Sequence, residues 1–120
     1  MQPTALIVDD HPSFRRFARK LLESAGYDVV GDAEDGGSAI DAVGALRPDV
    51  VLLDVLLPDM SGFDVAKALA ALPERPLVVL TSSRSASDLG VLLRTENATG
   101  FISKRDLTAA ALAALVGEAA

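Results

Sequence analysis

The sequence predicts an α/β domain built on a doubly wound, five-stranded parallel sheet with five helices. Short apolar runs of strand character alternate five times with segments of helical periodicity. The central run, residues 49–54, is apolar from Val50 to Leu53, which is typical of a parallel strand covered on both faces. With 120 residues, we expect one domain, 1–120, whose strands are joined by right-handed helical crossovers.

The first strand is expected over residues 4–8, directly before the acid pair Asp9-Asp10. Pro12 then opens a helix, because a first helical turn tolerates a missing N–H, and Gly26 ends it. The apolar stripe of this helix, expected to face inward, comprises Phe14, Phe17, Ala18, Leu21, Leu22 and Ala25. The charged residues off the stripe, expected to form a solvated face, are Arg15, Arg16, Arg19, Lys20 and Glu23.

A second, shorter strand is expected over residues 27–31. The turn 35–38 leads into a helix that Pro48 stops. The residues of this helix expected to face inward are Ile40, Val43 and Leu46. The third strand then ends in Asp54, outside whose carboxyl end a ligand crevice is expected.

Serine and aspartate three residues apart open the next two helices, at Ser61 and again at Ser85, in the spacing of a capping pair. Between these helices, residues 76–80 form a fourth strand, followed by Thr81. The inward residues of the two helices are Val65, Leu69 and Leu72, and Leu89, Leu92 and Leu93.

The fifth strand, residues 100–103, ends at Lys104, and Asp106 is expected to cap the last helix. Helical spacing places Thr108, Leu112 and Leu115 inward. The opposite face comprises Ala110, Ala113, Ala114 and Gly117. This uncharged face is either ordinary alanine-rich surface or the contact of a homodimer.

Composition excludes several classes of function. The net charge of −6 is the wrong sign for a nucleic-acid backbone, so we expect no direct nucleic-acid binding by this chain. The absence of cysteine excludes disulfides and thiol chemistry. No apolar run reaches the roughly 18 residues of a membrane span, and we find no signal peptide, so no membrane association and a cytoplasmic location are expected.

Four strand ends carry chemically capable side chains: Asp9-Asp10, Asp54, Thr81 and Lys104. In a parallel sheet these ends share one edge, where crowded carboxylates repel unless a cation lies among them. Oxygen ligands without cysteine suit Mg²⁺. A carboxylate beside Mg²⁺ can attack phosphorus, while a hydroxyl and an ammonium stabilise the phosphoryl oxygens.

The motifs that carry this chemistry are Val8-Asp9-Asp10, Leu53-Asp54, Leu57-Pro58-Asp59-Met60-Ser61-Gly62, Leu80-Thr81 and Gly100-Phe101-Ile102-Ser103-Lys104. Five such motifs, in order at the proper strand ends, resemble the receiver domain of two-component response regulators, which has a flavodoxin-like fold. The resemblance covers essentially all 120 residues. The segments 9–12 and 103–107 are most similar to the subfamily with a LuxR-type helix-turn-helix output domain, which implies a role in transcription regulation.

The resemblance implies that Asp54 is the phosphoacceptor, served by a histidine kinase or phosphotransfer protein. It implies that Asp10 binds Mg²⁺ directly, that Asp9 acts mainly through water, and that the backbone carbonyl of Leu56 is the third protein ligand. Because the side chain of Leu56 is apolar, it cannot orient an attacking water, which indicates a long-lived phosphoryl group.

Three further residues receive roles by the same resemblance. Thr81 is the switch hydroxyl, Lys104 binds the phosphoryl group, and Phe101 is the aromatic residue that turns inward when Thr81 moves. Phe101 is equally well explained as a core residue. Arg105 departs from the family pattern, since many receivers have there a proline in a cis peptide bond.

Two alternatives remain, and neither is a signalling switch. A haloacid-dehalogenase-type phosphatase also uses an aspartate nucleophile with Mg²⁺, but it needs a second aspartate where this chain has Leu56. A non-phosphorylated receiver-like binding module would be expected to lack one of the site residues. His11 could be a metal ligand or a phosphohistidine, but is adequately explained as a loop residue before Pro12. As a signalling domain, the chain would catalyse only its own phosphorylation and dephosphorylation.

Overall fold

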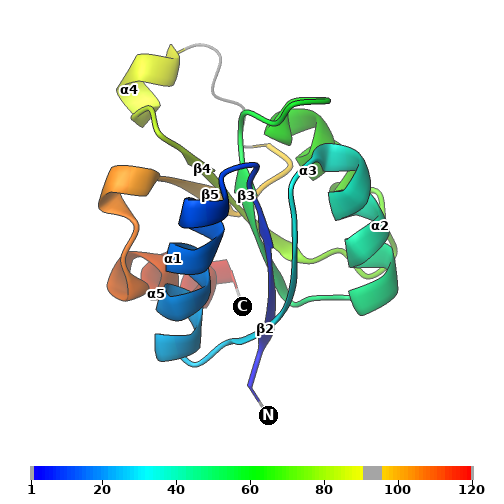
Figure 1. The fold of residues 1–120 in the computed structure, drawn as a ribbon, viewed down its shortest axis with the longest axis horizontal. Coiled ribbons are helices and arrows are strands. Elements are labelled where there is room, and N and C mark those ends of the chain that lie inside the picture. The colour runs from blue at the N-terminus through cyan, green and yellow to red at the C-terminus, as the bar shows by residue number, and fades with distance from the viewer. Residues whose placement is uncertain (1, 91–95, 120) are drawn as a thin grey trace.

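The computed structural model describes residues 2–90 and 96–119 (Figure 1). Leu92 and Leu93, predicted to face inward, lie outside the described residues. Five parallel strands form one sheet in the order β2-β1-β3-β4-β5, which confirms the predicted fold class. The strands are β1 (Thr4–Val8), β2 (Asp28–Ala33), β3 (Val50–Asp54), β4 (Leu77–Ser82) and β5 (Gly100–Ser103).

Helices follow the strands as predicted. They are α1 (Pro12–Ser24), α2 (Gly36–Leu46), α3 (Gly62–Ala70), α4 (Ala86–Leu89), the 3-10 turn η2 (Lys104–Asp106) and α5 (Ala109–Ala119). Figure 1 shows α1 and α5 on one face of the sheet and α2 and α3 on the other, with α4 drawn at the top. None of the described helices combines the length and the apolarity needed to cross a membrane.

Alternating strand residues build one core on each face. The α1-face core contains Ala5, Ile7, Ala18, Leu22, Val29, Val50, Leu52, Val79, Ile102, Leu107 and Leu112. The α2-face core contains Leu6, Val8, Ala33, Ala39, Val43, Val51, Leu53, Val55, Leu57, Val65, Ala66, Leu69, Val78 and Leu80. Because both faces are covered, the central strands read as continuous apolar runs in the sequence.

Three predicted details of the core and of β2 are wrong. Phe17 is 50% exposed, because the smaller Ala18 and the next-turn Leu22 fill the space between α1 and the sheet. Leu46 is 45% exposed, because it is the last residue of α2 and lies across Gly31 of the edge strand β2. The second strand begins one residue later than predicted and continues to Ala33, since the amide of residue 27 bonds back to α1.

The helix starts confirm two predicted caps and correct a third. The Oγ atoms of Ser61 and Ser85 each accept a hydrogen bond, 3.1 Å long, from the amide three residues on. Asp106 does not cap α5, because it lies in η2 and accepts from Ser103 Oγ. Thr108 Oγ1 is the cap instead, accepting from the amide of residue 111 at 3.0 Å, and it is therefore exposed rather than inward.

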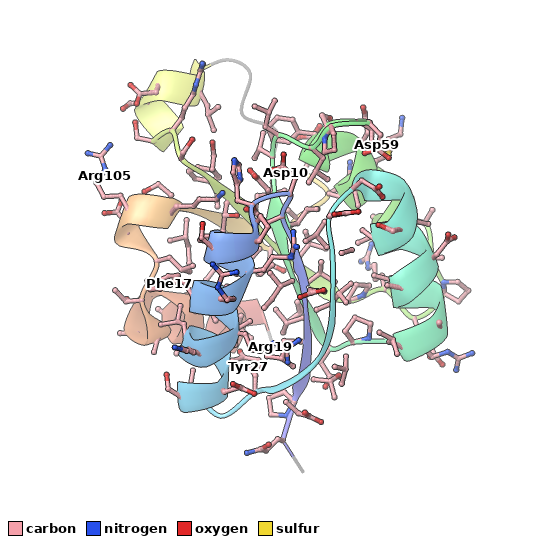
Figure 2. The ribbon with its side chains drawn as sticks, viewed as in Figure 1. Asp10, Phe17, Arg19, Tyr27, Asp59 and Arg105 are labelled. Atoms are coloured by element: carbon pink, nitrogen blue, oxygen red, sulfur yellow. The ribbon has the colours of Figure 1, made fainter. Side chains whose placement is uncertain are left out.

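The loop between β3 and α3, residues 55–61, is fastened to the start of α2. The carboxylate of Asp59 accepts hydrogen bonds from the amides of Gly36, at 2.8 Å, and Gly37, at 2.9 Å (Figure 2). These two bonds lower the pKa of Asp59, as expected for an acid at the positive end of a helix. Met60 packs so closely on Gly36 that a Cβ there would collide with its side chain. We call this arrangement the Asp59 latch.

Candidate functional site

The register of the sheet brings the predicted site residues to one edge. In the β3–β4 pairing, Asp54 lies opposite Thr81. The β1–β3 pairing ends one residue earlier, so Asp9 follows β1 beside Asp54. Lys104 follows directly after β5, on the far side of β4. The predicted clustering of these strand ends is therefore confirmed.

The ammonium of Lys104 lies between two buried carboxylates. Its Nζ atom is 2.6 Å from Asp9 Oδ2 and 3.4 Å from Asp54 Oδ2. Asp9 is 0% exposed and Asp54 3% exposed, so little solvent screens these charges. One ammonium cannot neutralise two carboxylates, and a net negative charge is left at the centre of the site.

The pKa values of the two buried acids are shifted in opposite directions. Burial, together with repulsion from Asp9, raises the pKa of Asp54 to about 6, although Lys104 and the amide of Leu56 oppose the rise. Burial would also raise the pKa of Asp9, but hydrogen bonds from Lys104 and from the amide and ring of His11 outweigh it and lower the pKa. The ionised form of Asp9 is therefore favoured, whereas burial and repulsion disfavour the ionised form of Asp54.

The raised pKa of Asp54 predicts how the free energy of unfolding changes with pH when no cation is present. The folded-state pKa of Asp54, about 6, exceeds its ordinary value of 3.8, so the folded protein holds the proton more tightly. The free energy of unfolding therefore falls as the pH rises between these values. Asp54→Asn, which stays neutral, is expected to be about 1 to 3 kcal/mol more stable than wild type above about pH 7 and equal to it below about pH 4.

Urea denaturation in EDTA at both pH values measures this difference. Asp41→Asn, at an exposed position of α2, is the control and should have no such effect. If Asp54→Asn were no more stable than wild type above pH 7, ionised Asp54 would not be under strain.

Asp10 and His11 complete the acidic cluster. His11 Nδ1 is 2.9 Å from Asp9 Oδ1 and 3.1 Å from Asp10 Oδ1, and the His11 amide donates to Asp9 Oδ1 at 2.8 Å. The side chain of Asp10 is 39% exposed, and Figure 2 labels it at the end of β1. One ligand atom from each of Asp9, Asp10, His11 and Asp54 lies within 4.8 Å of the others, which is a compact enough set to hold a metal ion.

The remaining predicted residues lie around this cluster. Thr81 is 1% exposed, and its Oγ1 has no hydrogen-bond partner among the described residues. The amide of Leu56 donates to Asp54 Oδ1 at 3.2 Å, while its side chain is 76% exposed. Phe101 pairs with Leu80 across β4 and β5 and packs, partly buried, on the α2-face core. A pocket of about 690 Å³ opens beside Asp54.

Residues 5–116 match the family of the response regulator receiver domain. The chain is a receiver domain of a two-component response regulator. The receiver domain acts in phosphorylation-dependent signalling, and the match favours neither the phosphatase nor the non-phosphorylated binding module.

Its relatives include the nitrate/nitrite response regulator protein NarP of Escherichia coli, 43% identical over 82% of this chain and 46% of NarP. The DNA-binding response regulator MtrA of Mycolicibacterium smegmatis is 40% identical over 87% of this chain and 45% of MtrA. A two-component response regulator of the LuxR family from Aurantimonas has a similar structure, with a TM-score of 0.82 at 27% identity, covering 98% of this receiver and 87% of that chain. The LuxR-type resemblance is thus confirmed, and the chain spans about half the length of the two curated relatives.

Sequence reasoning missed three residues that shape the site. Arg15 was assigned to the solvated face, but its side chain is only 18% exposed, donates to the Asp9 carbonyl at 2.7 Å and lies 3.7 Å from Asp32. Phe14, assigned to the core, also contacts Lys104. Gly62, which the sequence shows only as the last residue of the motif 57–62, must be glycine for a steric reason, because a Cβ there would collide with the Asp54 carbonyl.

Proposed function

We propose that Asp54 accepts one phosphoryl group from a histidine kinase or a phosphotransfer protein in a Mg²⁺-dependent reaction. The observation that supports this role is its placement: among the described residues, Asp54 is the buried carboxylate that lies beside Lys104 and is paired with Thr81 on the neighbouring strand β4. A carboxylate oxygen of Asp54 would attack phosphorus as the bond to the donor's imidazole nitrogen breaks.

The donor set fits Mg²⁺, which prefers carboxylate and carbonyl oxygens and keeps several waters. Asp10, exposed beside the pocket, would bind the ion directly, together with Asp54 and the backbone carbonyl of Leu56. Asp9, whose two oxygens face His11 and Lys104, would act through water. When bound, the ion neutralises the crowded carboxylates and the incoming phosphoryl oxygens.

Thr81 and Lys104 would hold the new phosphoryl group. The Thr81 hydroxyl is buried without a partner among the described residues, so it has a hydrogen bond to offer to a phosphoryl oxygen. Lys104 would exchange its contact with the Asp54 carboxylate for one with the phosphoryl group. Movement of Thr81 towards the group would free space for Phe101 to turn inward, which links the site to β5.

The direct test is the intact mass of the protein after incubation with acetyl phosphate. We expect the mass of one phosphoryl group to be added when Mg²⁺ is present and none in EDTA. Addition that does not require Mg²⁺, or no addition under either condition, would contradict the proposal.

We also propose a signalling output and a location, both of which extend beyond this chain. In the cytoplasm, phosphorylation would change the association of this domain with an output domain or a partner protein. It would also change the formation of a homodimer through α5. The exposed residues Ala110, Ala113, Ala114 and Gly117 give α5 an uncharged outer face, which supports close approach of a second copy.

Ala113→Glu is expected to weaken this dimer, because it places a charge in the contact, and to leave phosphorylation of Asp54 intact. Ala45→Glu, at an exposed position of α2, is the matched control. Sedimentation equilibrium with and without beryllofluoride, used as a mimic of the phosphoryl group, measures the association of both variants in the two states. If Ala113→Glu and Ala45→Glu associate alike in both states, the outer face of α5 is ordinary surface.

A further inference from the structure

The ammonium of Lys104 lies over the ring of Phe14, a residue of α1. Its Nζ atom is 4.3 Å from the ring centroid, within the distance of about 6 Å at which the negative face of an aromatic ring attracts a cation. The contacts of this ammonium with Asp9 and Asp54 are ionic. Phe14 is therefore a neighbour of Lys104 that carries no formal charge.

The position of this ring is fixed by the surrounding structure. Phe14 lies in the first turn of α1, which begins at Pro12, and packs against the α1-face core. Phe17, one turn later, has its ring centroid 6.0 Å from that of Phe14, yet it is half exposed (Figure 2). The two neighbouring phenylalanines thus differ in one respect that matters for the site, since the ring of Phe14 lies under Lys104.

We propose that Phe14 is a positioning residue for Lys104, which keeps the ammonium beside Asp54 when the carboxylates bind a cation. This inference rests on the proposed function. Asp9 and Asp54 would then have to share their oxygens between Lys104 and the cation, or a water bound to it, and both ionic contacts of Lys104 would weaken. The ring of Phe14 offers no oxygen to a metal ion, so its attraction for the ammonium persists.

The expected effect is on the rate of phosphorylation. Without the ring face, Lys104 occupies the productive position for a smaller fraction of the time, and phosphoryl incorporation slows about fivefold, as for loss of a partly buried cation–π contact. The final stoichiometry stays the same, because Asp54 is unchanged.

The experiment compares Phe14→Leu, Phe14→Tyr and Phe17→Leu by the rate of mass gain with acetyl phosphate and Mg²⁺. Phe14→Leu keeps an apolar side chain without a ring face and should react more slowly than wild type. Phe14→Tyr restores the ring face, and Phe17→Leu removes the neighbouring ring, so both should react at close to the wild-type rate. A ring-fluorinated phenylalanine at position 14 keeps the shape but weakens the negative face; it should be slow, and it decides the matter if Phe14→Leu is unstable.

Proton NMR gives a second readout that needs no phosphoryl group. The ring current of Phe14 should move the Lys104 Hε resonances upfield in wild type and Phe17→Leu, but not in Phe14→Leu. Equal rates for the fluorinated protein and wild type, or unshifted Lys104 resonances in wild type, would overturn the proposal. If wild type gained no mass at all, the proposed function would fail, and the Lys104 resonances would still decide whether Phe14 holds this side chain.

Discussion

Asp54→Asn is expected to gain no phosphoryl group from acetyl phosphate under conditions in which the wild-type protein gains one. An amide in place of the carboxylate is too weak a nucleophile to attack phosphorus. Asp9 cannot substitute for it, because that carboxylate is fully buried and is held by His11 and Lys104. The expected loss is therefore complete rather than partial.

Intact mass spectrometry of wild type and Asp54→Asn, each with and without Mg²⁺, measures this loss. Asp64→Asn is the matched control, since Asp64 lines the same pocket but lies at the start of α3. It should be labelled like wild type. Labelling of Asp54→Asn to the same stoichiometry would show that another residue is the acceptor.

Asp10→Ala is expected to weaken Mg²⁺ binding by at least about tenfold, and Asp9→Ala by less. The structure supplies a physical reason for this order. The Asp10 side chain is 39% exposed and close to the pocket, so it can reach an ion without breaking an ion pair with lysine. Both oxygens of Asp9 already contact Lys104 or His11, so we expect Asp9 to act on the ion through water.

Isothermal titration of Mg²⁺ into wild type and the two variants measures the two losses separately. Asp41→Ala, on the exposed side of α2, controls for a general change in net charge. A loss for Asp9→Ala that equals or exceeds the loss for Asp10→Ala would reverse the two proposed roles.

The strand-end residues could be predicted because they depend only on topology. Once the apolar run of β3 is assigned to a parallel sheet, the register places Asp54 opposite Thr81 and beside the end of β1. Lys104 follows from the same argument at the end of β5. Such placements depend on the order of strands and helices, which the pattern of apolar residues in the sequence predicts.

Contacts made by long side chains could not be predicted in this way. Helical spacing assigned Arg15 to the solvated face, yet its guanidinium reaches back to the Asp9 carbonyl. A helical wheel shows the direction of a Cβ atom and omits the several bonds beyond it. The exposure of Phe17 and Leu46 was missed for a related reason, since periodicity does not show where a helix extends past the surface that covers it.

The Asp59 latch joins the first turn of α2 to the loop that follows β3, so we expect the two segments to open together in local unfolding. The first amides of α2 would be open to solvent exchange if Asp59 left them, and residues 55–61 would lose their anchor in the same event. The rate of deuterium uptake by the Gly36 and Gly37 amides should therefore report how often the loop beside Asp54 opens. A ligand that rests on this loop would slow exchange in a helix that it never touches.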